Sequence, residues 1–126
     1  MSQRPAIVAI EEDADGGDLR VTITLDWKNE KYYGQAIGAE GAEHRSRLAG
    51  EATLRALEHL FGDRVDLELL AIATQDLGVL QIALAQVRLG DDETLVGNAV
   101  LSPQEPGWAA AKAVMDALNR RLGLLL

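Results

Sequence analysis

The residues best suited to chemistry are His44, Arg45 and Arg47, which stand near the start of a helical pattern. The free N–H groups of a helix start, together with nearby basic side chains, favour the binding of an anion such as a carboxylate. The same residues also fit a solvated helix end without a ligand, because His and Arg are mostly exposed in folded proteins. His59 falls near the end of the same helical pattern, where a cationic side chain favours the dipole, and we interpret it as structural.

Other chemistries find no support in the sequence. Glu11, Asp13 and Asp15 precede a glycine at intervals like those of a calcium loop, but the twelfth position is Thr22, where the loop needs Glu. The chain has no Cys, and its two His do not have the spacing of metal ligands. The residues GAEGAE lack the spacing of a dinucleotide fingerprint, and no Ser–His–Asp arrangement can be assembled. We therefore predict no metal, no cofactor and no catalytic residue, and a plain hairpin turn at 11–17.

The balance of charge limits the partners and the compartment. The chain carries 20 acidic and 12 basic residues, for a net charge of −8. Proteins that bind nucleic acid neutralise phosphates with clustered Lys and Arg, so we expect no nucleic-acid partner. The N-terminal residues lack the apolar run of a signal peptide, and no segment reaches the roughly 20 apolar residues of a transmembrane helix. We expect a cytoplasmic protein with no membrane contact.

Hydrophobic periodicity predicts the same order of elements twice. Residues 19–27 alternate between apolar and polar positions, as in a half-buried strand. Apolar stripes at helical spacing run from Leu48 to Phe61 and from Ala110 to Leu122, and each ends at a glycine. The remaining strands are expected at 6–10, 32–38, 65–74, 78–89 and 94–101, with the second helix beginning near residue 106.

This order predicts an α+β fold in which a βββα unit is duplicated, with antiparallel strands and two helices packed on one side. We expect a single domain over 1–126, made of a unit at 5–62 and a pseudo-symmetric unit at 65–123. The endings "ATLRALEHLFG" and "AVMDALNRRLG" lie 61 positions apart, whereas Gly34 and Gly97 lie 63 apart. The chain between third strand and helix is therefore two residues shorter in the second unit. Chance similarity of two amphipathic helices is the alternative, but the repeated strands and glycines favour duplication.

The strand expected at 78–89 is apolar on both faces. Such a strand must be covered on both sides, and helices cover one of them. The small residues on one face favour a second sheet or subunit that packs closely there. We therefore predict a homodimer with Ala83 and Ala85 at or near its interface.

The second half of the chain also carries a pattern of glycines and alanines. A turn ends in Gly, a long strand follows, then a strand with Gly-x-Ala, and then a helix with Ala-x-Ala-x-x-x-Ala-Leu-Asn-Arg. The residues are Gly78, Gly97, Ala99, Ala111, Ala113, Ala117, Leu118, Asn119 and Arg120. This pattern resembles the end of the C-terminal allosteric (dimerisation) domain of 2-isopropylmalate synthases and citramalate synthases, here as a divergent standalone domain.

The resemblance implies a pair of βββα units and a site for a feedback amino acid at the glycine-rich loops before the helices. The chain departs from the family in ways that bear on function. Its 126 residues are too few for the catalytic barrel of that family, so we do not expect them to carry out the synthase reaction. The first loop keeps Gly38 and Gly41 but has no Gly-Pro and no Asp, and "SPQEPGW" replaces the Thr-Asp-Ile segment of the second loop.

We expect a non-catalytic regulatory or assembly module, homodimeric, that senses a small carboxylate or amino acid. A pseudo-twofold axis would bring the two strand-to-helix loops to related places, with helix N–H groups free to bind the ligand. The expected ligand-binding residues are Gly38, Gly41, His44, Arg45, Ser102 and Trp108. Two alternatives stay open: a small standalone enzyme that acts on a carboxylate substrate, and a regulatory subunit that acts in trans on a partner enzyme.

Overall fold

The computed structural model describes residues 4–101 and 106–125 and contains six strands and two long helices in the order βββαβββα. The first unit comprises β1 (Ala6–Asp15), β2 (Asp18–Trp27), β3 (Glu30–Ala39) and α1 (Ala42–Phe61), followed by a short 3-10 turn, Gly62–Arg64. The second unit comprises β4 (Leu67–Leu77), β5 (Leu80–Leu89), β6 (Glu93–Val100) and α2 (Pro106–Leu125). The predicted α+β fold with two βββα units is confirmed.

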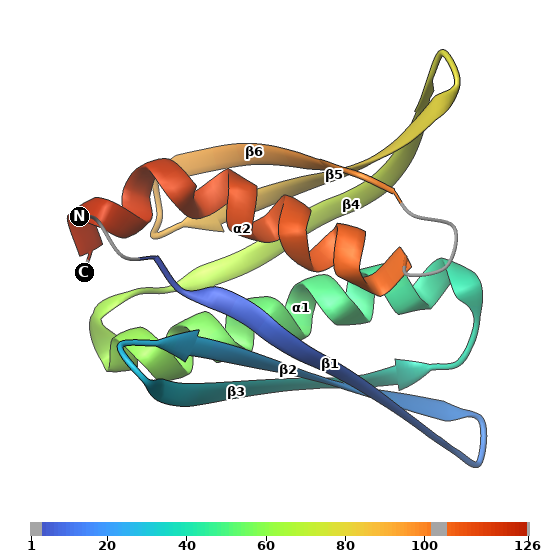
Figure 1. The fold of residues 1–126 in the computed structure, drawn as a ribbon, viewed down its shortest axis with the longest axis horizontal. Coiled ribbons are helices and arrows are strands. Elements are labelled where there is room, and N and C mark those ends of the chain that lie inside the picture. The colour runs from blue at the N-terminus through green and yellow to red at the C-terminus, as the bar shows by residue number, and fades with distance from the viewer. Residues whose placement is uncertain (1–3, 102–105, 126) are drawn as a thin grey trace.

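The two units form two separate sheets with the helices between them (Figure 1). Each sheet has three antiparallel strands in the order of the chain, β1-β2-β3 and β4-β5-β6. Helix α1 packs on β2 and β3, helix α2 packs on β5 and β6, and the helices pack on each other. Each sheet therefore has an inner face covered by a helix and an outer face on which the described chain places no helix.

The first hairpin is longer than the sequence pattern indicates. The predicted turn at 11–17 is wrong in extent, because β1 continues to Asp15, which pairs with Asp18 across a turn at Gly16 and Gly17. Both glycines have positive φ, 61° and 91°, so a turn of two residues suffices and the acidic segment stays in the ladder. The acidic residues of β1 thus lie on a strand beside β2.

A glycine in the third strand of each unit lets a helix approach the sheet closely. A Cβ atom at Gly34 would lie 2.1 Å from the Ala56 nitrogen and 2.2 Å from the Ala52 oxygen. A Cβ atom at Gly97 would lie 2.2 Å from both the Ala117 nitrogen and the Ala113 carbonyl oxygen. Side-chain atoms do not fit at such distances, so the helix backbone rests directly on the glycine. The repeated glycines and alanines of the sequence are thus the same contact made twice.

Buried residues of both units form one core. The inner faces of β2 and β5 supply Leu19, Val21, Ile23 and Leu25, and Ala83, Ala85 and Val87. The helices supply mostly Ala and Leu, as expected for helices that approach sheets closely. The polar Thr53 is also fully buried, and its hydroxyl donates a hydrogen bond to the Ala49 carbonyl at 2.7 Å.

Candidate functional site

At the start of α1, where an anion site was predicted, Arg45 is paired with a carboxylate of the chain itself. The N–H groups of His44 and Arg45 both donate to the Gly41 carbonyl at 3.1 Å, which closes the first turn of the helix. The Arg45 side chain reaches to β1, where its Nε lies 2.8 Å from a carboxylate oxygen of Glu12. A Cβ atom at Gly107, in the first turn of α2, would lie 4.0 Å from the second carboxylate oxygen of Glu12. Both helix starts therefore lie near Glu12.

Sequence reasoning missed Glu12 because it assigned that residue to a turn. Of the predicted ligand residues, Gly41, His44 and Arg45 lie together at this end of α1, and the His44 side chain is exposed. Gly38 serves packing, since a Cβ there would lie 2.9 Å from a methyl group of the Leu48 side chain. Ser102 lies outside the described residues.

Trp108 lines a groove between α2 and β1, which we call the α2–β1 groove. The groove has a volume of about 420 Å³. Its apolar lining is formed by Pro5, Ile7, Trp108 and Met115, and its polar lining by Arg4, Lys112, Asp116 and Asn119. The Lys112 ammonium lies 5.7 Å from the centre of the Trp108 ring, within range of a cation–π contact. Trp108 thus borders a concave surface, but with partners other than the predicted loop residues.

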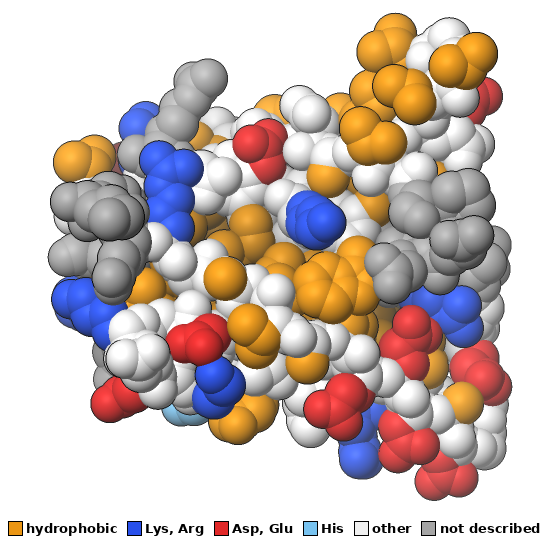
Figure 2. Space-filling view, in the orientation of Figure 1, with side chains coloured by type: hydrophobic (Ala, Val, Ile, Leu, Met, Phe, Trp, Pro, Cys, Tyr) orange, Lys and Arg blue, Asp and Glu red, His pale blue; other side chains and the backbone are white. Residues whose placement is uncertain are grey.

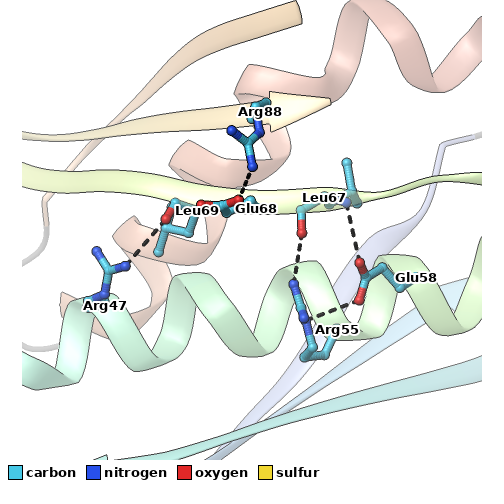
Figure 3. Close-up of polar contacts among 7 residues, drawn as sticks. All are labelled: Arg47, Arg55, Glu58, Leu67, Glu68, Leu69 and Arg88. Carbon is cyan, nitrogen blue, oxygen red and sulfur yellow. Dashed lines mark hydrogen bonds and ion pairs between the residues drawn. The ribbon is translucent and has the colours of Figure 1, made fainter. Parts of the chain in front are cut away.

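The matching groove of the first unit is lined by α1, β3 and β4 and has a volume of about 530 Å³. Figure 3 shows Arg47 and Arg55 extending from α1 to the edge of β4. Arg47 donates to the Leu69 carbonyl at 3.3 Å, and Arg55 donates to the Leu67 carbonyl at 3.0 Å. The Leu67 N–H in turn donates to Glu58 at 3.3 Å. These edge-capping side chains, Arg47, Arg55 and Glu58, occupy backbone groups that would otherwise be open to another strand.

Ala83 and Ala85 are predicted to lie at or near a subunit interface, but the structure places them on the inner face of β5. Their side chains are only 4% and 1% exposed, because they face the helices inside the chain. Ala85 pairs with Gly97, the residue on which α2 rests, so the small side chains accommodate a close helix. They offer almost no surface to a second subunit. The side chains that remain for a partner are those on the opposite face of the strand.

That opposite face, the outer face of the β4–β6 sheet, is apolar. Alternation along the strands and the cross-strand pairs place there Leu77, Leu80, Ile82, Leu84, Val96 and Val100, with Ala71, Ala73, Gln75, Gln86, Thr94 and Asn98 between or beside them. Val96 and Val100 are 67% and 61% exposed. The described charges on this face are Glu68 and Arg88 at one end, and they form an ion pair with each other. Leu77, Val79 and Leu80, at the tip of the β4–β5 hairpin, are exposed, and Figure 2 shows hydrophobic side chains gathered at this tip.

Among the residues that the structure describes, pKa values are shifted at two places, and neither place lines one of the two grooves. A hydrogen bond from Arg121 lowers the pKa of Glu93 below its ordinary value, against an opposing effect of desolvation. A hydrogen bond to the Glu30 carboxylate raises the pKa of Tyr32. The first contact ties the end of α2 to the start of β6, and the second lies at the β2–β3 hairpin. Both are explained by a single neighbouring charge, as in structural ion pairs.

Across residues 4–101 and 106–125, no group of three or more His, Asp or Glu side chains is placed to hold a metal ion. Neither helix, as far as its residues are described, combines the length and apolar character needed to cross a membrane. No protein-family model matches this chain, and no curated protein matches it.

Proposed function

We propose that the protein is a non-catalytic module for regulation or assembly, and that it acts as a homodimer joined through the outer faces of two β4–β6 sheets. The observation that carries this proposal is the exposed apolar face of that sheet. A strand that is apolar on both sides is stable in water when both sides are covered. The helices cover the inner face of this sheet, so we infer that a second molecule covers its outer face.

The charge distribution favours a second copy of the same chain as the partner. Two molecules that each carry −8 repel one another, so they associate best through a face without net charge. The outer face of the β4–β6 sheet meets this condition, since Glu68 and Arg88 neutralise each other. On the β1–β3 sheet the corresponding strand β2 instead carries Arg20, Thr22 and Asp26. The outer faces of the two sheets thus differ in charge, and self-association favours the face without net charge.

The available area is sufficient for a specific contact. Three strands spaced by about 4.8 Å, with a rise of about 3.3 Å for each residue, form a face of roughly 14 by 30 Å. Two such faces, packed about 10 Å apart as in a β-sandwich, bury on the order of 1,000 Å² in total, since side chains corrugate them. This is the lower limit for a stable biological interface.

A module is favoured over an enzyme by the state of the basic residues. The alternative of a standalone enzyme requires His44 and Arg45 in an enclosed site, whereas His44 is exposed and Arg45 is paired with Glu12. The resemblance to the allosteric domain of 2-isopropylmalate synthases agrees with a dimeric module of this kind. A role in trans on a partner enzyme is compatible with the same dimer.

Thiol labelling tests the proposed dimer face. The chain has no Cys, so Leu84→Cys and Thr22→Cys each introduce a single thiol at corresponding central positions of the two sheets. Both native residues are partly buried within the chain. We expect the thiol at position 84 to react slowly with a water-soluble reagent and to react faster on dilution, as the dimer dissociates. The thiol at position 22 should react at one rate at every concentration. Equal and concentration-independent rates would show that the β4–β6 face is not covered.

A further inference from the structure

The two units differ in how a helix meets the first strand of a sheet, and this difference opens the α2–β1 groove. In the first unit the edge-capping side chains reach from α1 to the backbone of β4 (Figure 3). Their counterparts 61 positions later, on α2, are Trp108, Asp116 and Asn119. Asp116 accepts a hydrogen bond from the Asn98 N–H on β6 at 2.9 Å, so its carboxylate is engaged with the other sheet.

The result is a groove with an apolar floor. Trp108 takes the place of Arg47 in the first unit, and Met115 and Ile7 line the groove beside it. Figure 2 shows this side of the molecule, with hydrophobic side chains gathered over α2 and basic side chains beside them. A volume of about 420 Å³ is within the range of pockets that bind small molecules.

Two cations border this floor. Arg4 and Lys112 both line the groove, and the described part of the chain provides neither with an ion-pair partner. By contrast, Arg47 and Arg55 in the matching groove are paired with Glu51 and Glu58. In a chain of net charge −8, two such cations beside apolar side chains favour an anion with an apolar body.

The edge of β1 at this place is unsuited to an added strand. Pro5 has no N–H to donate, and the register of β1 shifts between Ile7 and Ala9, at a bulge. Both features interrupt the regular hydrogen bonds that an extended peptide would need. A small molecule needs no such ladder.

We propose that the α2–β1 groove binds a small apolar monocarboxylate. Its carboxylate lies between Arg4 and Lys112, and its hydrocarbon part packs on Trp108, Met115 and Ile7. The groove is formed by α2 and β1, whereas the proposed dimer contact is formed by the outer face of β4–β6, so the two proposals are independent.

Octanoate is a suitable probe, and Trp108 reports its binding. In a Trp27→Phe background, Trp108 is the single tryptophan. We expect octanoate to change its fluorescence saturably at millimolar concentration, and octanol, which has no charge, to bind about tenfold more weakly. The combined change Arg4→Gln and Lys112→Gln should raise the Kd for octanoate by about tenfold or more.

A matched control separates a local effect from a change in overall charge. Arg20→Gln removes one charge, as Arg4→Gln alone does, from a position on β2 that pairs with Asp13, six residues along β1 from Ile7 of the groove. It should leave the Kd unchanged. Circular dichroism would verify that each variant is folded. A Val100→Lys variant, altered at the dimer face, should bind octanoate as the parent does. The proposal is overturned if octanoate gives no saturable change, if octanol binds equally well, or if Arg20→Gln weakens binding as much as Arg4→Gln.

Discussion

Gly97→Ala is expected to destabilise the protein by about 3 kcal/mol, near the upper end of the cost of overpacking a core. The added methyl group would lie 2.2 Å from two backbone atoms of α2, so the helix must move away from the sheet. Gly34→Ala should cost a similar amount, because it makes the same clash with α1 in the other unit. Out of a total stability of about 5–15 kcal/mol, either change is large. Urea denaturation followed by circular dichroism measures it.

Gly107→Ala is the matched control for these substitutions. This glycine is also buried and also lies at a helix, but a Cβ there would meet the Ala49 methyl at 3.7 Å, an ordinary contact. Because alanine favours the helical conformation over glycine, the change should leave the protein equally stable or slightly more stable. Similar midpoints for Gly97→Ala and Gly107→Ala would show that close helix approach is not what the repeated glycines provide.

Val100→Lys is expected to convert the protein to monomers at micromolar concentration. In a symmetric dimer the change places two lysines in the contact, and burying an unpaired charge costs several kcal/mol. We expect the dimer Kd to rise by at least about a hundredfold, which corresponds to about 2.7 kcal/mol. Size-exclusion chromatography with light scattering gives the mass of each species.

The corresponding position on the other sheet provides the control. Ile37 lies 63 positions before Val100 and is 59% exposed, compared with 61% for Val100. Ile37→Lys therefore changes size, charge and exposure in nearly the same way, but on a face that stays exposed to solvent in the proposed dimer. It should not alter the mass. If both variants shift the mass equally, the effect of Val100→Lys comes from net charge and not from the contact.

The order of elements could be predicted from the sequence because it depends on local patterns. Alternation at 19–27 and the helical stripes reflect which side of each element is buried, and burial has the period of the element. The spacing of Gly34 and Gly97 relative to the helices also follows from the chain, since each glycine contacts alanines at fixed positions. The boundaries were less accurate: α1 begins at Ala42, six residues before the apolar stripe.

The face on which β5 is exposed could not be predicted from periodicity alone. Small residues on one face of a strand fit either a close sheet or a close helix, and both arrangements have the same period. In this protein the small residues of β5 face a helix. Gly97 contacts α2, and Ala85 lies directly beside Gly97 in the ladder. A pattern of this kind in another sequence would be interpreted better with the glycine of the neighbouring strand included.

The candidate site depends on contacts between distant segments, which local patterns do not contain. Arg45 meets Glu12 only because β1 continues beyond its apolar residues. Trp108 borders a groove whose other wall is formed by Pro5 and Ile7, about 100 positions earlier in the chain. The position of Trp108 at a helix start therefore predicts a concave surface, but it does not predict which distant residues form the rest of that surface.

Sedimentation equilibrium of the unmodified protein, over a range of micromolar concentrations, tests the proposed association most directly. We expect a species of twice the 13.6 kDa chain mass at the higher concentrations. On dilution the mass should fall toward that of the single chain, as expected for an interface near the lower size limit. A mass of 13.6 kDa at every concentration would contradict the proposal that the apolar face of the β4–β6 sheet joins two chains.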